Sequence, residues 1–208
     1  PPPPEMKLTP AGTVETPFYA ELSDAGKRHP VTRGLLGGDT SPPHWSRWFR
    51  LVDARAGSGT TVMDGPDKKP LLVLSREGEG RVGLLLSDHI WLWARNINKG
   101  GPYLDLLRPV VHWLMKEPDL EEEALRVKQQ GGHLLVERQT LGESVAPLTL
   151  TTPSGQQQSV TLEQSGAGLW RQAVPVAEAG LYQLRDGTLT AFAHIGPANP
   201  REWAQVVS

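Results

Sequence analysis

The segment PLLVLSREGEGRVGLLLSDHIWLWAR, residues 70–95, limits the fold more than any other part of the chain. Two short apolar runs, Leu71–Leu74 and Val82–Leu86, are separated by the polar, glycine-containing stretch SREGEGR. This pattern predicts two buried strands joined by a hairpin. The second strand is followed at once by Ser87–His89. Since ligands in open α/β sheets lie beyond the carboxyl ends of the strands, we expect any site to lie there.

A helix is predicted to begin at Gly101-Pro102, because proline is well tolerated in a first helical turn. Pro109 should bend this helix and Pro118 should end it. Four apolar residues recur at helical spacing and are expected to form its buried face: Leu104, Leu107, Val111 and Leu114. The mixture of strands and a helix predicts an α/β domain.

The pattern changes at the acidic run 119–123, which we interpret as a hinge. Beyond it, short and often alternating segments are divided by turn sequences, which predicts an all-β immunoglobulin-like sandwich. Ala179–Tyr182 resembles the tyrosine-bearing entry to a late strand of such a domain. The boundary is expected between Lys116 and Ala124. The expected organisation is an extended lead-in at 1–17, an α/β domain at 18–118 and a sandwich at 124–208.

The composition excludes several classes of function. The 208 residues include no cysteine, which rules out a thiol nucleophile, a disulfide framework and a thiolate zinc site. The net charge is −2 and no basic run occurs, so nucleic-acid binding is not expected. No apolar run approaches the roughly 20 residues that cross a bilayer. The histidines lack metal-ligand spacing and the glycines form no phosphate-binding motif, so no metal or cofactor is expected.

Four segments resemble a family of large bacterial inner-membrane proteins that carry a glutamine amidotransferase-like domain between membrane-spanning segments. These segments are HPVTRGL at 29–35, HWSRWFR at 44–50, residues 70–95, and GPYLDLLRPVVHWLMKEPDLEEEALR at 101–126. The resemblance implies the later part of a class I, flavodoxin-like α/β domain, followed by an immunoglobulin-like sandwich. It also implies a membrane-anchored parent protein, a location on the periplasmic side of the inner membrane and protein partners in the cell envelope.

Both ends of the chain fit this picture. The proline-rich start PPPPEMKLTP lacks an initiating methionine, so we expect the chain to be a piece of a longer protein. The tail AFAHIGPANPREWAQV, residues 191–206, resembles the strand and Asn-Pro-x-Glu turn that end similar sandwiches in membrane-anchored, von Willebrand-type proteins.

Amidotransferase chemistry is not expected. Class I glutamine amidotransferases need a cysteine nucleophile, with a histidine and a glutamate two positions apart to activate and orient it. The chain has no cysteine and no His-x-Glu pair. The resemblance therefore implies the fold of that family without its reaction.

Asp88 and His89 are the sharpest candidate for a site. A carboxylate beside an imidazole at a strand end could position a water molecule or hold a ligand. Adjacent residues of an extended strand point to opposite faces, however. The alternative interpretation is therefore a capping aspartate beside a half-buried histidine.

A second candidate is the aromatic and basic cluster formed by HWSRWFR. Arginine offers a flat bidentate fork and tryptophan a stacking face, which together could hold an anionic sugar or a carboxylate. The same residues could instead form a loop packed on the sheet, with arginine stems over the indoles. The candidate ligand-binding residues are Trp45, Arg47, Trp48 and Arg50, with Asp88 and His89.

Two classes of function follow from these patterns. The first is a non-catalytic extracytoplasmic module that binds or scaffolds protein partners through an exposed aromatic patch, for which Trp45, Trp48 and Trp203 are candidates. The second is a hydrolase or carbohydrate-handling enzyme that uses Ser87–His89, completed by residues upstream of Pro1. The lack of a usable nucleophile and base favours the first.

Overall fold

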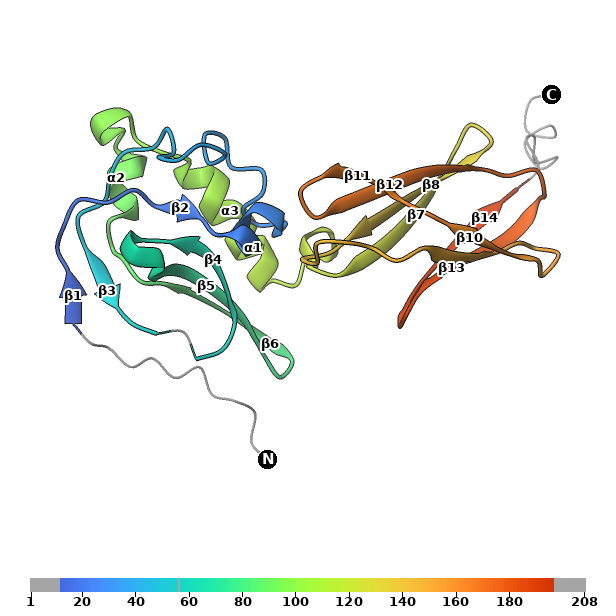
Figure 1. The fold of residues 1–208 in the computed structure, drawn as a ribbon, viewed down its shortest axis with the longest axis horizontal. Helices are drawn as coiled ribbons and strands as arrows, with labels where there is room; N and C mark the ends of the chain where they lie inside the picture. The colour runs from blue at the N-terminus through green and yellow to red at the C-terminus, as the bar shows by residue number, and fades with distance from the viewer. Residues whose placement is uncertain (1–11, 56, 197–208) are drawn as a thin grey trace, which may run out of the picture. The chain divides into compact units, whose positions relative to one another are not determined.

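The computed structural model describes residues 12–55 and 57–196. The chain divides between Glu122 and Glu123 into two compact units, each with its own hydrophobic core. About 42% of the residues lie in strands and 16% in helices. The two units are described separately below, and Figure 1 gives the labels of their elements.

The main sheet of the first unit has four antiparallel strands in the order β2-β4-β5-β6 (Figure 1). A separate pair, β1 and β3, is also antiparallel. β1 lies within the segment that was predicted to be an extended lead-in. The strands are β1 (Gly12–Val14), β2 (Glu21–Leu22), β3 (Leu51–Asp53), β4 (Thr60–Asp64), β5 (Pro70–Glu77) and β6 (Gly80–Leu85).

The prediction of a flavodoxin-like α/β fold is wrong. A parallel sheet needs crossover connections of a dozen or more residues, usually through a helix. Here β4 and β5 are joined only by a turn that contains the 3-10 helix η1 (Pro66–Lys68), and β5 and β6 by the turn Gly78-Glu79. Connections this short return the chain antiparallel to the strand it leaves. Strands with longer connections, such as β2 and β4, also pair antiparallel.

The predicted hairpin is confirmed, although its strands are longer than expected. β5 and β6 pair in unbroken register from Leu72 opposite Leu85 to Glu77 opposite Gly80. The polar ends of both strands therefore continue the ladder instead of forming a wide loop. They can do so because Arg76 and Arg81, which face each other across the ladder, bind acidic partners described below.

Short helices cover the main sheet. The Ser23 hydroxyl caps α1 by accepting a hydrogen bond from the Gly26 amide at 2.9 Å. A Cβ on Gly26 would lie 1.9 Å from the carbonyl oxygen of Val62, so glycine lets α1 pack directly on β4. The helical elements are α1 (Asp24–Arg28), α2 (Ile90–Ala94), η2 (Ile97–Lys99), α3 (Tyr103–Leu114) and η3 (Pro118–Leu120).

The helix α3 buries a different face from the one predicted. Leu106, Val110 and Trp113 are buried, whereas Leu104 and Val111 are 62% and 49% exposed. The apolar residues of α3 cover more of its circumference than one sheet can bury. The side that carries the large Trp113 indole faces the sheet, and the predicted stripe is left along one flank.

The second unit contains two four-stranded antiparallel sheets around one core. One sheet has the order β10-β9-β13-β14 and the other β11-β12-β8-β7. Leu134, Leu150 and Leu184, one residue from each of three strands, are fully buried between the sheets. The strands are β7 (Ala124–Gln130), β8 (His133–Gln139), β9 (Leu148–Thr151), β10 (Gln157–Val160), β11 (Glu163–Gly166), β12 (Leu169–Pro175), β13 (Gly180–Asp186) and β14 (Leu189–Ile195).

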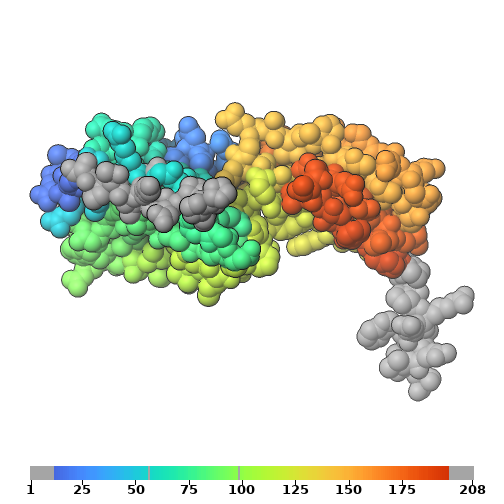
Figure 2. Space-filling view, turned by 90° about the horizontal axis from the view of Figure 1, so that it is seen from below, coloured from blue at the N-terminus to red at the C-terminus, as the bar shows by residue number. Residues whose placement is uncertain are grey.

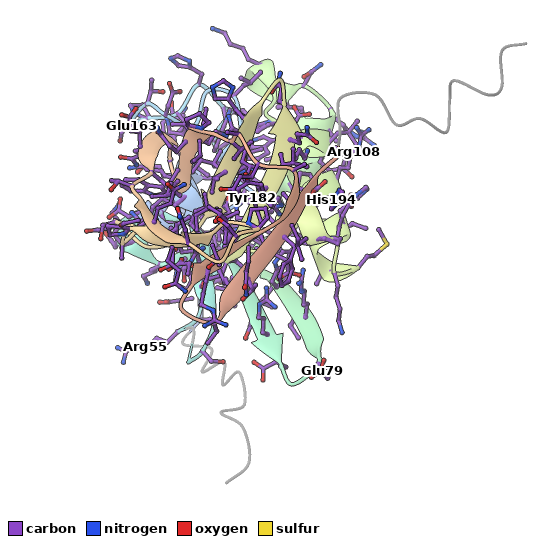
Figure 3. All side chains as sticks on the ribbon, turned by 90° about the vertical axis from the view of Figure 1, so that its right-hand side faces the viewer. Arg55, Glu79, Arg108, Glu163, Tyr182 and His194 are labelled. Carbon is purple, nitrogen blue, oxygen red and sulfur yellow. The ribbon has the colours of Figure 1, made fainter. Side chains whose placement is uncertain are left out.

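Tyr182 lies at the centre of this unit in Figure 3, in the strand where the sequence placed it. Its side chain is 2% exposed. Its hydroxyl donates to the Glu178 carbonyl at 2.9 Å and accepts from the Glu178 amide at 3.2 Å. A buried tyrosine bonded to the backbone a few residues upstream is typical of the tyrosine corner of immunoglobulin-like domains.

None of the helices among the described residues combines the length and the apolar character needed to span a bilayer. Trp203 and most of the tail that was compared with von Willebrand-type proteins lie outside the described residues.

Candidate functional site

Ser87 fixes the start of the segment that carries Asp88 and His89. Its hydroxyl donates to the Arg50 carbonyl at 2.6 Å and accepts from the His89 amide at 3.2 Å. Ser87 is buried, so these two hydrogen bonds replace the ones that its hydroxyl would otherwise make to water. The segment after β6 is thereby tied to the chain just before β3.

His89 is held by the backbone of Phe49. The Phe49 amide donates to His89 Nδ1 at 3.0 Å, and the two rings meet edge-on with centroids 6.2 Å apart. A neutral imidazole whose Nδ1 accepts a hydrogen bond carries its proton on Nε2. The His89 Nε2 atom lies 3.8 Å from Asp88 Oδ1, close but beyond hydrogen-bond distance.

This arrangement favours a structural role for His89 over a role as a general base. A general base needs a free lone pair, and here Nδ1 is engaged while Nε2 holds the proton. The His89 side chain is 19% exposed and that of Asp88 is 68% exposed. The pair thus lies at the surface, with its imidazole committed to holding the Phe49 loop against the strand end.

The structure does not bring the tryptophans and arginines of HWSRWFR together on one surface. Trp45 and Trp48 are buried and pack on Trp93, with ring centroids 5.2 and 4.9 Å apart. Arg47 is exposed, and Arg50 pairs with Glu15 at 3.4 Å with both side chains largely in solvent. The indoles therefore belong to the core, and the arginines lie outside it.

Metal binding has no support in the part of the chain that is described, where no group of three or more histidine, aspartate or glutamate side chains could hold an ion. The carboxylates that meet imidazole or guanidinium groups serve in ion pairs, and Glu121 and Glu122 each contact two such groups.

Sequence reasoning missed a buried network around Glu122. The Glu122 Oε1 atom accepts from Trp113 Nε1 at 3.0 Å and lies 3.4 Å from Nε2 of the fully buried His29. Arg76 donates to the other carboxylate oxygen of Glu122 and to Glu121. The network ties together the end of α1, helix α3, the β5–β6 hairpin and the acidic run.

Arg81 extends this network. It is 3% exposed, binds the Glu121 carboxylate, and donates to the Trp113 carbonyl at 2.6 Å. Its guanidinium carbon also lies 4.9 Å from the centroid of the Trp113 ring, a cation–π contact. The first two glutamates of the acidic run are therefore structural parts of the first unit.

The electrostatics of Glu122 follow from these partners. Burial by itself raises the pKa of its carboxyl, but hydrogen bonds from His29 and Arg76 outweigh burial and lower the pKa to about 2. The pKa of Glu121 is also lowered, because Arg76 and Arg81 outweigh its burial. Both carboxylates are charged near neutrality. His29 and Glu122 are 93 residues apart, and neither has a local pattern that predicts the pairing.

The second unit carries a surface groove that the sequence did not indicate. It has a volume of about 710 Å³ and lies over the outer face of the β11-β12-β8-β7 sheet. Leu135 is 39% exposed at its floor, while its neighbours Leu134 and Val136 point into the core. We call this hollow the β8 groove; it is lined by Arg126, Lys128, Leu135, Val136, Glu137, Glu163, Gln164, Ser165, Arg171, Gln172 and Ala173.

The β8 groove has an apolar floor and a charged rim. Ala173 lies opposite Leu135 in the ladder, and its small side chain leaves room above the sheet. Arg171 binds Glu137 through two nitrogens at 2.6 and 2.8 Å. Lys128 is exposed on the β7 side and Glu163 on the β11 side, so the rim offers both signs of charge. Figure 3 shows Glu163 at the outside of this unit.

Comparisons of the chain with protein-family models, with curated proteins and with solved structures find no match. The likeness to glutamine amidotransferase-like membrane proteins and the immunoglobulin-like designation of the second unit therefore stay predictions.

Proposed function

We propose that this chain is a non-catalytic binding module that holds a protein partner through the β8 groove. The observation that carries the proposal is the groove itself: a hollow of about 710 Å³ whose floor is aliphatic and whose rim is charged. Binding sites commonly combine a concave apolar surface with a few polar groups that fix orientation.

The strand-end segment gives the alternative, an enzyme, no comparable support. The Nδ1 atom of His89 is engaged by the Phe49 amide, and the Ser87 hydroxyl donates to the Arg50 carbonyl. A nucleophile and a base within reach of each other are the minimum for covalent hydrolysis. Both side chains are instead bonded to main-chain groups, which favours a structural role for this segment.

The chemistry of the β8 groove indicates what kind of partner fits. Leu135 and Ala173 suit an aliphatic side chain, Lys128 suits a carboxylate and Glu163 suits a basic group. The matching partner is a protein segment with an aliphatic residue between an acidic and a basic one. The resemblance to envelope proteins adds the proposal that this partner lies on the periplasmic side of the inner membrane.

Site-specific photocrosslinking tests the proposal. The photoreactive residue p-benzoylphenylalanine replaces Leu135 in one variant of the chain, produced in the bacterial cell envelope. Thr149, which is exposed on the opposite sheet of the same unit, is replaced in the matched control. We expect ultraviolet light to produce a discrete protein adduct from position 135 and none from position 149.

Two further results sharpen the test. Adding Lys128→Glu should abolish the adduct, because it reverses the charge on one side of the rim. An adduct of equal yield from both positions, or none from position 135, would contradict binding at the groove.

A further inference from the structure

Four charged residues at the β8 groove form one row across the whole sheet. Glu163 of β11 lies opposite Arg171 of β12 in the ladder. Arg171 in turn lies opposite Glu137 of β8, and Glu137 lies opposite Arg126 of β7. Directly opposite residues of an antiparallel pair share a face of the sheet, so all four side chains lie on the side of the groove. Their charges alternate in sign from one strand to the next.

Three charges of the groove are bound to one another. Arg171 holds the Glu137 carboxylate through two nitrogens at 2.6 and 2.8 Å, and Arg126 lies 3.4 Å from the same carboxylate. Glu163 and Lys128 are exposed, and neither has an ion-pair partner among the residues that the structure describes. A partner in the groove therefore meets one free negative charge on β11 and one free positive charge on β7, at opposite edges of the sheet.

The apolar floor does not lie midway between these two free charges. Lys128 is directly opposite Leu135 on the neighbouring strand, so their Cα atoms are about 5 Å apart. Glu163 is two strands away from β8 and two residues further along the ladder. At about 4.8 Å per strand and about 3.4 Å per residue, its Cα atom lies about 12 Å from that of Leu135. The free lysine is therefore near the floor and the free glutamate is far from it.

The size of the floor favours an extended occupant over a helix. A helix docks through apolar side chains from several successive turns, which needs a long apolar groove. The exposed apolar side chains of the β8 groove are Leu135 and Ala173, which lie opposite each other and leave room for one aliphatic side chain. An extended segment turns every second side chain to the same face, about 7 Å apart, so it can place one aliphatic residue between two charged ones.

We propose that the β8 groove binds an extended segment in which the acidic residue is two positions from the aliphatic one and the basic residue is four positions from it on the other side. This inference rests on the function proposed above and adds the spacing. The acidic side chain meets Lys128 and the basic one meets Glu163. Two and four extended residues span about 7 and 14 Å, within side-chain reach of the 5 and 12 Å separations estimated above.

Two blocked peptides of identical composition test the spacing. The first is Asp-Thr-Leu-Thr-Ser-Thr-Lys, in which the acid is near the leucine and the base is far from it. The second is Asp-Thr-Ser-Thr-Leu-Thr-Lys, in which the base is near and the acid is far. Each is also made with its sequence reversed, because a strand in the groove can run in either direction, and the tighter of the two directions is compared.

Backbone amide NMR shifts of the 208-residue chain measure the binding and locate it. The first peptide should bind at least tenfold more tightly than the second, because it meets both free charges with the opposite sign. It should shift the amides of β8 and β12. Leu181 and Phe192, which are 54% and 59% exposed on the other sheet, are the internal control and should not shift. Their strands, β13 and β14, lie in red-orange at the surface in Figure 2.

Exchanging the two free charges should reverse the preference. Lys128→Glu combined with Glu163→Lys keeps the net charge and should bind the second peptide more tightly than the first, a gain that misfolding cannot produce. Equal affinity for the two peptides, binding of neither, or a preference that the exchange leaves unchanged would overturn the proposed spacing. The crosslink from position 135 does not depend on this spacing, so it decides the proposed function separately.

Discussion

Replacing Glu122 by glutamine tests whether the acidic run is a structural part of the first unit. The pKa of this carboxyl falls from an ordinary value of 4.5 to about 2 in the folded chain. A difference of about 2.5 pH units, at about 1.4 kcal/mol each, corresponds to about 3 kcal/mol of stability from the charged form. The side chain is only 14% exposed, so solvent screening reduces this contribution little.

The sign of the pH dependence follows from the direction of the shift. Because the folded pKa lies below the unfolded one, the contribution is fully present above about pH 4.5 and is lost as the pH falls toward 2. Glu122→Gln removes the charge, so we expect it to lower the free energy of unfolding by up to about 3 kcal/mol at pH 7. The gap between variant and wild type should then narrow below pH 4.5.

Urea unfolding at pH 7, 4.5 and 3, followed by tryptophan fluorescence, measures this gap. Glu79→Gln is the matched control, because Glu79 lies exposed at the tip of the β5–β6 hairpin in Figure 3. The control should stay within about 0.5 kcal/mol of wild type. A Glu122→Gln variant as stable as the control, or a gap that does not change with pH, would refute the reasoning.

Three further predictions, which use four substitutions, probe the first unit by the same urea unfolding. Trp48→Phe should lower the free energy of unfolding by about 1 kcal/mol less than Trp93→Phe does. Trp93 Nε1 donates to the Ser46 carbonyl at 3.1 Å, whereas Trp48 Nε1 is buried without a partner among the described residues. Equal losses of stability in the two variants would contradict this. Gly26→Ala should cost about 2 kcal/mol, because its Cβ would collide with the backbone of β4; a neutral effect would show that α1 can move away. His89→Gln should change stability by no more than ~1 kcal/mol, since a glutamine oxygen can accept the Phe49 amide; a much larger loss would make the imidazole indispensable.

The sequence predicts the β5–β6 hairpin well, because two short apolar runs and the glycine-containing turn between them determine it. It does not distinguish a parallel from an antiparallel sheet. A continuous apolar run such as Leu71–Leu74 indicates a strand that is buried on both faces. Such a run occurs in a parallel sheet that is covered by helices on both faces. It also occurs in an antiparallel sheet that is covered by a helix and packed loops. The resemblance to flavodoxin-like domains then favoured the wrong alternative.

The helix face and the site illustrate a second limit. The stripe from Leu104 to Leu114 and the stripe that contains Leu106 and Trp113 are both apolar at helical spacing, and only the position of the sheet decides between them. His29 and Glu122 meet across 93 residues. The β8 groove is formed by outward-facing residues of alternating strands, which in sequence cannot be told from an ordinary solvated face.

The most direct test compares how tightly the crosslinked partner binds to three forms of the chain. It distinguishes a role for the β8 groove from a role for the strand-end segment. The forms are wild type, Leu135→Glu, which puts a charge on the apolar floor, and His89→Ala, which removes the candidate imidazole. Isothermal titration with the purified partner should show affinity lowered by about tenfold or more, over 1.4 kcal/mol, for Leu135→Glu. His89→Ala should bind as wild type does. Affinity that is lost with His89→Ala and kept with Leu135→Glu would contradict the proposed function.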